Sequence, residues 1–250
     1  MKRNLQVLLL LLTGAGLLHI ALFSDLYLRY VKAGLRPLLI ASGVLLVLLG
    51  MIAAARDGFP FSRDEPGHGP DDHHDDHGHD HSKGPRIAWL LYVPALLLLL
   101  FAPPALGSYT ASRNDTATTS GAGTFPALPG KDPLALSVSE FGSRAKWDTD
   151  RSLRGRTVRL TGFVTPGTNG TWYLTRLIVT CCAADATAFK VEMHGATAPP
   201  ADTWVTVTGT WRPTGKVGTD SARAALDTAT VKRIPEPDDP YQDLPRIRAS

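Results

Sequence analysis

Cysteine is scarce in this sequence, because its 250 residues contain only two, Cys181 and Cys182, side by side. Two cysteines exclude a miniprotein held by several disulfides, and they exclude a structural zinc site with four cysteine ligands. The formal net charge is only +3, and no basic stripe with interleaved aromatic residues is present. We therefore expect no nucleic-acid partner.

Motifs of common enzyme classes are also missing. The sequence has no glycine-rich phosphate-binding loop and no His-Glu-x-x-His helix. Ser137, Ser139 and Ser143 stand in no recognisable nucleophile context, and a flexible acidic turn explains Asp148 and Asp150. We predict that the protein is not an enzyme and needs no organic cofactor.

Two long apolar runs lie in the N-terminal part of the chain. Residues 5–24 and 37–55 carry no Asp, Glu, Lys or Arg, and about 20 helical residues at 1.5 Å each span a hydrocarbon core of about 30 Å. The sequence predicts a transmembrane hairpin over residues 1–55, with Gly43 and Gly50 as close-packing points. A cleaved signal peptide is the alternative for the first run, but no clear small-x-small site closes it.

A third uncharged run covers residues 87–106. Trp89 and Tyr92 stand at its start, where an interfacial aromatic belt would lie, and Pro103 and Pro104 should end it. The alternative, a buried helix of a soluble domain, explains three such runs poorly. We predict a third transmembrane helix and therefore a lipid-bilayer environment. Within the first run, His19 is a functional candidate because intramembrane histidines are rare, and a neutral imidazole bonded to a neighbouring helix is the alternative.

Histidine and aspartate are concentrated in residues 56–86, which we predict to be a disordered loop. Imidazole suits zinc, copper and nickel, and carboxylates add oxygen ligands. The loop holds eight acidic against four basic residues, so it would attract cations. A solvated low-complexity loop without a physiological metal is the alternative. The predicted ligands are His68, His73, His74, His77, His79, His81, Asp72, Asp75, Asp76 and Asp80.

The C-terminal part has the alternation typical of strands. A linker over residues 107–133 and a short amphipathic helix within 134–147 precede it. Turn residues then separate five predicted strands, at 157–164, 172–182, 188–193, 204–211 and 229–234. Two of these strands carry an internal glycine that suits coiling. The predicted fold class is therefore membrane-anchored α plus all-β: three transmembrane helices, then a small five-stranded OB-like β-barrel domain over residues 134–237 and a polar tail over 238–250.

Cys181 and Cys182 end the second predicted strand. Adjacent strand residues point to opposite faces, so we expect one thiol in the core and the other towards solvent or a partner. Three interpretations remain open: a structural pair, a soft-metal site with Asp185 or His194 as a further ligand, and a vicinal disulfide or redox relay. Asp185 is alternatively a turn cap, and His194 a surface residue.

The distribution of basic residues orients the chain. With the N-terminus in the cytoplasm, the cytoplasmic segments hold six Lys and Arg residues and the opposite segments hold four. This mild positive-inside preference predicts a multi-pass membrane protein whose N-terminus and His-rich loop are cytoplasmic. The C-terminal domain is then extracytoplasmic.

Several segments resemble the YcgQ-like family of bacterial proteins, which are described as subunits of two-component membrane permease complexes. The resemblance rests on residues 30–39 with the run that follows, on 94–108 and 162–164, and most specifically on Arg-Leu-Ile-Val-Thr-Cys-Cys-Ala-Ala-Asp-Ala over 176–186. It implies a bacterial cell-membrane protein that acts beside a separate multi-span permease, with a suggested link to zinc or another divalent transition metal. It carries over no catalytic residues.

We therefore expect an accessory permease subunit whose His/Asp loop binds metal and whose β-domain binds a ligand or partner. One alternative is a membrane-anchored metal carrier or redox protein that uses Cys181 and Cys182. Another is a structural scaffold for a permease that handles no metal.

Overall fold

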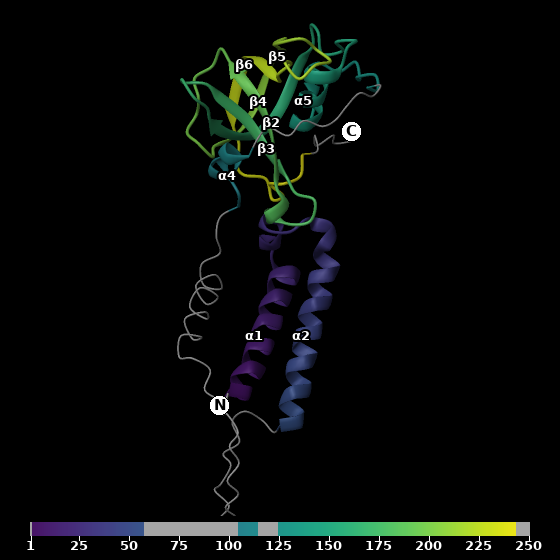
Figure 1. Ribbon diagram of the computed structural model, residues 1–250, viewed down its shortest axis with the longest axis vertical. Coiled ribbons are helices and arrows are strands. Elements are labelled where there is room, and N and C mark those ends of the chain that lie inside the picture. The colour runs from purple at the N-terminus through teal and green to yellow at the C-terminus, as the bar shows by residue number, and fades with distance from the viewer. Residues whose placement is uncertain (1, 58–104, 115–124, 244–250) are drawn as a thin grey trace, which may run out of the picture. The chain divides into compact units, whose positions relative to one another are not determined.

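The computed structural model describes residues 2–57, 105–114 and 125–243 (Figure 1). These residues belong to two compact units. Of the described residues, one unit contains 2–16 and 42–57, and the other contains 17–41, 105–114 and 125–243. The His/Asp loop, most of the predicted third span and the end of the polar tail lie outside the described residues.

Two long helices form where the first two apolar runs were predicted. Helix α1 covers Lys2–Phe23 and helix α2 covers Arg36–Asp57. Both are long and apolar enough to cross a membrane, a criterion of length and composition that a signal sequence near the N-terminus also meets. A Cβ on Gly14 would lie 2.8 Å from the Gly43 carbonyl oxygen, and one on Gly50 would lie 2.8 Å from Leu11 Cδ2. The predicted glycines therefore do lie where the two helices approach closely.

The segment between the two helices is structured. It contains the short 3₁₀ helices η1 (Leu26–Arg29) and η2 (Ala33–Leu35), and it buries Tyr27 and Leu28. The Arg36 guanidinium lies 5.8 Å from the centre of the Tyr27 ring, and its Nε donates to the Ala21 carbonyl oxygen at 2.8 Å. That bond satisfies one of the carbonyls that the end of α1 leaves without a helical partner. The side chains of this segment therefore hold it in a defined conformation.

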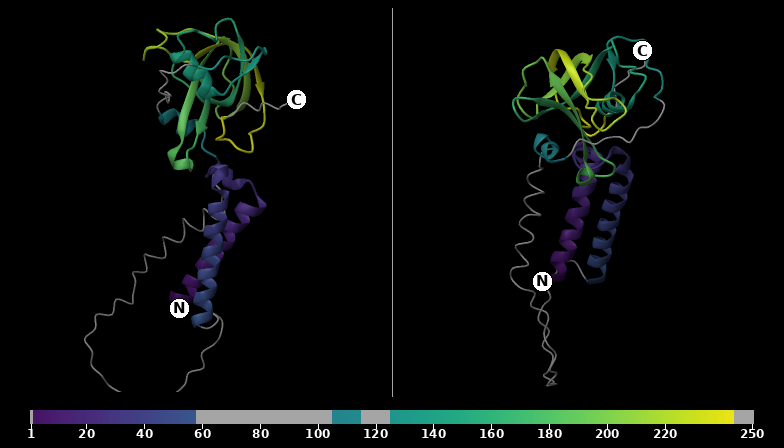
Figure 2. Two further views of the ribbon diagram at one scale, coloured as in Figure 1. Left: turned by 90° about the vertical axis from the view of Figure 1, so that its right-hand side faces the viewer. Right: turned by 45° about the horizontal axis from the view of Figure 1, so that its top comes forward.

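The C-terminal part is a mixed sheet of six strands, five of which close into a ring (Figure 2). The order is β1-β2-β3-β4-β6-β5, and β5 also pairs with β2. The β1–β2 and β4–β6 pairs are parallel, and the other pairs are antiparallel. The strands are β1 (Leu134–Ala135), β2 (Thr157–Pro166), β3 (Trp172–Ile178), β4 (Thr187–His194), β5 (Trp204–Trp211) and β6 (Ala225–Arg233).

The five ring strands correspond to the five predicted strands, and two of their bounds differ from the prediction by four residues. Strand β3 ends at Ile178, so the predicted extension to Cys182 was wrong. Strand β6 begins at Ala225, earlier than the predicted 229. The additional strand, β1, lies where the helix prediction began, and its two residues are strand only because they pair with β2. The internal glycine of β2 is needed for packing, because a Cβ on Gly162 would lie 2.6 Å from the Thr175 carbonyl oxygen.

Helix α5 (Val138–Trp147) packs against β3 and β4 and closes one side of the core. Ser137 caps its N-terminus by accepting a hydrogen bond from the Glu140 N–H at 3.1 Å. Its buried side chains, Val138, Phe141 and Ala145, join the core of the sheet. The sequence predicted this short amphipathic helix, but the predicted range began at residue 134, four residues before the helix begins.

A short helix, α4 (Ser108–Arg113), occupies part of the segment that was predicted to be a linker without regular structure. Asp202, in the connection between β4 and β5, accepts from both the backbone N–H and the hydroxyl of Ser108, the latter at 2.8 Å. Leu106 donates its N–H to the Tyr241 hydroxyl at 2.8 Å. Residues 106–108, where the chain enters the domain, are therefore held by residues far away in the sequence. Local sequence patterns do not reveal such contacts.

Candidate metal centre

The two cysteines lie in a tight turn that follows β3. Asp185, at the end of the 3₁₀ helix η4 (Ala183–Asp185), reaches back across this turn. Its carboxylate accepts the backbone N–H of Thr180 at 2.8 Å and that of Cys181 at 2.8 Å. The Asp185 N–H in turn donates to the Cys182 carbonyl oxygen at 3.1 Å. Asp185 thus closes the turn through the backbone, as its alternative interpretation from the sequence allowed. We call residues Thr180–Asp185 the thiol turn.

Neither thiol faces the core, which corrects the expectation that one of them would. The strand ends before the cysteines, and Val179 is the last residue of this segment whose side chain is buried. Cys181 is exposed, Cys182 is half-buried, and both are free thiols. The alternation rule failed here because it applies only while the backbone remains in a strand.

Three metal-ligating groups converge in the thiol turn. The sulfur atoms of Cys181 and Cys182 and a carboxylate oxygen of Asp185 all lie within 4.8 Å of one another. Two thiolates and a carboxylate are ligands that zinc accepts at distances of about 2.0–2.3 Å. The cluster could therefore hold a metal ion with a modest inward movement of the side chains.

The electrostatics of the turn place a proton on Cys181 and a negative charge on Asp185. The Cys181 thiol donates to the Asp185 carboxylate and also interacts with Cys182, which together raise the pKa of Cys181 to about 11. That hydrogen bond, with those from the backbone of Thr180 and Cys181, lowers the pKa of Asp185. The Cys181 shift comes mainly from neighbouring acceptors and negative charge, and a bound dication would reverse the sign of that field.

The segment between α1 and α2 contacts the thiol turn through its backbone. Val31 and Cys182 form an antiparallel bridge. The Lys32 N–H donates to the Cys181 carbonyl oxygen at 3.1 Å, and the Ala183 N–H donates to the Tyr30 carbonyl oxygen at 2.7 Å. The backbone on both sides of Cys182 is therefore held by residues about 150 positions earlier in the chain. The sequence did not indicate this contact, because hydrogen bonds between backbone groups do not require particular side chains.

The other predicted ligands do not join this cluster. Strands β3 and β4 run antiparallel, with Ile178 opposite Thr187 and Trp172 opposite Met193. His194 therefore lies at the far end of the strand pair from the thiols, and its Nε2 is 3.1 Å from a Glu192 carboxylate oxygen. The ten predicted ligands between residues 68 and 81 lie outside the described residues. The His19 ring stands 5.8 Å from that of Phe23, measured between centroids.

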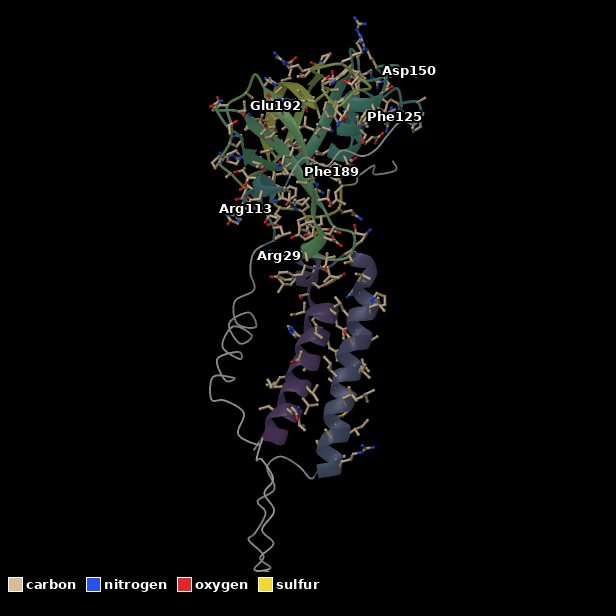
Figure 3. All side chains as sticks on the ribbon, viewed as in Figure 1. Arg29, Arg113, Phe125, Asp150, Phe189 and Glu192 are labelled. Carbon is tan, nitrogen blue, oxygen red and sulfur yellow. The ribbon has the colours of Figure 1, made fainter. Side chains whose placement is uncertain are left out.

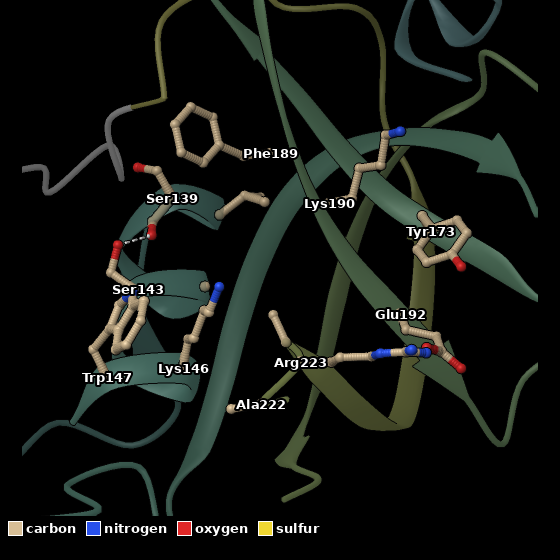
Figure 4. Close-up of a pocket in the computed structure, with 13 residues that line it drawn as sticks. Ser139, Ser143, Lys146, Trp147, Tyr173, Phe189, Lys190, Glu192, Ala222 and Arg223 are labelled. Carbon is tan, nitrogen blue, oxygen red and sulfur yellow. Dashed lines mark hydrogen bonds between the residues drawn. The ribbon is translucent and has the colours of Figure 1, made fainter. Parts of the chain in front are cut away.

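A cavity of about 330 Å³ is lined by residues of α5, β3 and β4 (Figure 4). Its lining includes Phe189 and Glu192 of β4, which Figure 3 also labels, Tyr173 of β3 and Lys146 of α5. Two of the charged groups here have partners, since Lys146 Nζ is 3.1 Å from Asp220 and Glu192 pairs with His194. The volume of this cavity lies in the range of small-molecule sites. Sequence patterns did not indicate the cavity, because it forms only when α5 packs on the sheet.

A second cavity, of about 480 Å³, contains the buried Arg176 in its wall. The Arg176 guanidinium lies 4.9 Å from the centre of the Trp204 ring, 3.7 Å from the Asp243 carboxylate, and donates to the Gln242 carbonyl oxygen. Burial lowers the pKa of Arg176, and Asp243 and Asp239 partly offset that shift. Asp243 also accepts the N–H groups of Val138 and Ser139 at the start of α5, so this cluster ties the C-terminal segment to the domain.

Comparison with known families gives one match. Residues 148–242 match the model of the DUF1980 C-terminal domain. The matched region contains the thiol turn and all five ring strands, and it excludes the helical hairpin. No curated protein and no solved structure matches the chain.

Proposed function

We propose that this protein is an accessory subunit of a bacterial membrane permease complex that handles zinc or another divalent transition metal, and that the thiol turn is its metal site. The convergence of two thiols and one carboxylate within 4.8 Å carries the proposal. Structural zinc sites use four protein ligands and are closed, whereas sites with three protein ligands keep a position open. A three-ligand site on an exposed turn suits an ion that is received and passed on.

The His/Asp loop has the complementary part in this proposal. Its six histidines and neighbouring aspartates would collect divalent ions with modest affinity, and its excess of acidic residues would raise the local cation concentration. Under the predicted topology this loop is cytoplasmic, so it and the thiol turn would serve opposite faces of the membrane.

The backbone contact between residues 30–32 and the thiol turn supports that topology. Segments that form hydrogen bonds with each other must lie on the same side of a membrane. An even number of crossings must then separate Arg36 from Ala105 if α2 spans the bilayer. The uncharged run at 87–106 would supply the second crossing, and a cytoplasmic N-terminus would place both the 30–32 segment and the β-domain outside.

We further infer that the ring of five strands has the OB-type arrangement. Counted within the ring, the strand order is first, second, third, fifth, fourth and back to first, with the third and fifth strands parallel. This order is the support for the OB-like interpretation. The cavity beside α5 is the best candidate for the ligand-binding role of the domain.

A cobalt titration of the full-length protein in lipid nanodiscs tests the metal site. Thiolate coordination to Co²⁺ gives a charge-transfer band that imidazole and carboxylate ligands do not give, so the His/Asp loop does not interfere. We expect a saturable band in the reduced protein, its displacement by zinc, and its loss in the Cys181→Ser/Cys182→Ser variant. A reduced, folded protein that gives no such band would contradict the proposal.

Thiol carrier or redox chemistry is the second candidate, favoured by the exposure of Cys181. Thiol–disulfide exchange requires a thiolate, and a pKa of about 11 leaves little thiolate at neutral pH. The same proton is displaced when a metal binds. The raised pKa of Cys181 and the convergence of its thiol with Cys182 and Asp185 therefore support the metal interpretation over the redox one.

A further inference from the structure

We propose that the backbone of Tyr30–Lys32 positions the metal ligands of the thiol turn, so that metal affinity depends on the segment between α1 and α2. The inference rests on the proposed metal function and names the element that controls it. It follows from the two hydrogen bonds that join this segment to Cys181 and Ala183.

The first step concerns what holds the thiol turn. Within the turn, the carboxylate of Asp185 fixes Thr180 and Cys181 from one side. Cys182 has an extended backbone, with φ −151° and ψ 170°, and its flanking carbonyl and N–H bond to Lys32 and Tyr30. Without these bonds the backbone around Cys182 would keep only the bond from its carbonyl oxygen to the Asp185 N–H, and the position of Cys182 relative to Cys181 would be less restricted.

The second step concerns the rigidity of the contacting segment. Tyr27 and Leu28 are buried, and Arg36 links the Tyr27 ring to the end of α1. The 30–32 segment is therefore held by contacts of its neighbours as well as by the thiol turn. A ligand set that is already ordered loses less conformational entropy when the ion binds, and this preorganisation appears as higher affinity.

The third step is the reciprocal effect. If the docked segment raises metal affinity, then bound metal must stabilise the docked segment by the same factor. Metal occupancy of the β-domain would in this way be transmitted to the segment that joins the two N-terminal helices. A permease partner that contacts this segment would then sense whether the site is loaded.

A proline substitution removes one bond with little other change. Lys32 has φ −61° and ψ 141°, which proline adopts without strain, and proline lacks the N–H that donates to Cys181. The matched control is Lys32→Ala, which removes the same side chain and its charge but keeps the N–H. One lost backbone hydrogen bond corresponds to roughly a three- to tenfold loss of affinity.

The test is the cobalt charge-transfer titration of the full-length protein in nanodiscs. We expect Lys32→Pro to bind Co²⁺ roughly three- to tenfold more weakly than Lys32→Ala. Equal affinity of the two variants would overturn the inference while leaving the metal function intact. Absence of the band from the wild-type protein would overturn the proposed function itself.

Hydrogen exchange of the wild-type chain provides a second measurement, which does not depend on the proline variant. Zinc should slow amide exchange in residues 26–36 of the wild-type protein and should leave it unchanged in Cys181→Ser/Cys182→Ser. Exchange in this segment that does not respond to zinc, under conditions where the cobalt band shows the site to be intact, would overturn the inference.

Discussion

Two turns of this domain are closed in the same way and differ in what surrounds them. Asp148, after α5, accepts the N–H of Asp150 at 3.1 Å and that of Ser152 at 2.9 Å. Asp185 accepts the N–H groups of Thr180 and Cys181. Asp148 is buried and joins Ser152 and Arg144 in a closed network, whereas Asp185 lies beside two accessible thiols.

The comparison shows that a turn-closing aspartate is not itself a sign of function. The hydrogen bonds that Asp148 accepts come from the backbone of its own turn and from the Ser152 hydroxyl, so we expect Asp148 to stabilise the fold of the domain. Asp185 is not part of a buried network. Its carboxylate and the Cys181 thiol are exposed and could contact an ion. The difference predicts that changes in the Asp148 turn alter folding, and that changes in the thiol turn alter metal binding.

The largest effect is expected from the thiols. Cys181→Ser/Cys182→Ser should weaken binding of zinc to the β-domain site at least ~100-fold, or about 2.8 kcal/mol, because both soft ligands are lost. The midpoint of thermal unfolding should stay nearly constant, because neither thiol is in the core. Zinc affinity is measured by competition with a chromogenic zinc chelator, because the variant has no thiolate to give a cobalt charge-transfer band. An unchanged affinity would assign the ion to other ligands.

Asp148→Ala should destabilise the domain by about 2 kcal/mol, since it removes a buried carboxylate that accepts the N–H groups of Asp150 and Ser152 and the hydroxyl of Ser152. Denaturant unfolding followed by tryptophan fluorescence measures this. Asp185→Ala is the matched change in the other turn and should cost no more than about 1 kcal/mol, because no residue of this turn is buried. Equal destabilisation by the two substitutions would remove the distinction between the turns.

Ionisation of Cys181 provides a third test. Its pKa is raised to about 11 chiefly by Asp185, so the thiolate fraction at pH 8 is small, and the alkylation rate should rise with pH up to that value. In a Cys182→Ser background, Asp185→Asn should lower the pKa of Cys181 and increase its iodoacetamide rate at pH 8 by about tenfold, after allowance for lower thiolate nucleophilicity. A slower reaction would contradict the assigned hydrogen bond.

The smallest effect concerns Gly142, in the middle of α5. A Cβ there would meet only Ala224 Cβ at 4.0 Å among the described residues, so packing does not require glycine. Gly142→Ala should stabilise the domain by about 1 kcal/mol through helix propensity while narrowing the cavity beside α5. A destabilised variant in thermal unfolding would show that the cavity wall cannot accept even a methyl group.

Periodicity and composition were sufficient for the local elements. The uncharged runs predicted α1 and α2, and the alternation of apolar and polar residues predicted the ring strands. Both patterns arise because apolar side chains face either lipid or the core. The same reasoning missed α4 and β1, since α4 is capped by Asp202 and β1 exists only through its pairing with β2. Both α4 and β1 therefore depend on contacts with residues distant in the sequence.

The candidate site was predicted in composition but not in geometry. Cys181, Cys182 and Asp185 were named as a group from their residue types and spacing, and the structure brings them together. His194 was named with them, but the antiparallel register places it at the other end of β4. The contact from Val31 was beyond prediction, because a backbone bridge between distant segments depends on neither side chain.

The most direct test of the central claim is labelling of Cys181 and Cys182 in intact cells with a membrane-impermeant thiol reagent, with and without zinc. These are the only thiols of the chain, so the readout reports a single turn. We predict labelling from outside the cell without prior reduction, and protection by zinc that Asp185→Asn weakens. Labelling from outside that zinc does not change would contradict a metal site, and labelling that requires cell lysis but no denaturant would place the β-domain in the cytoplasm.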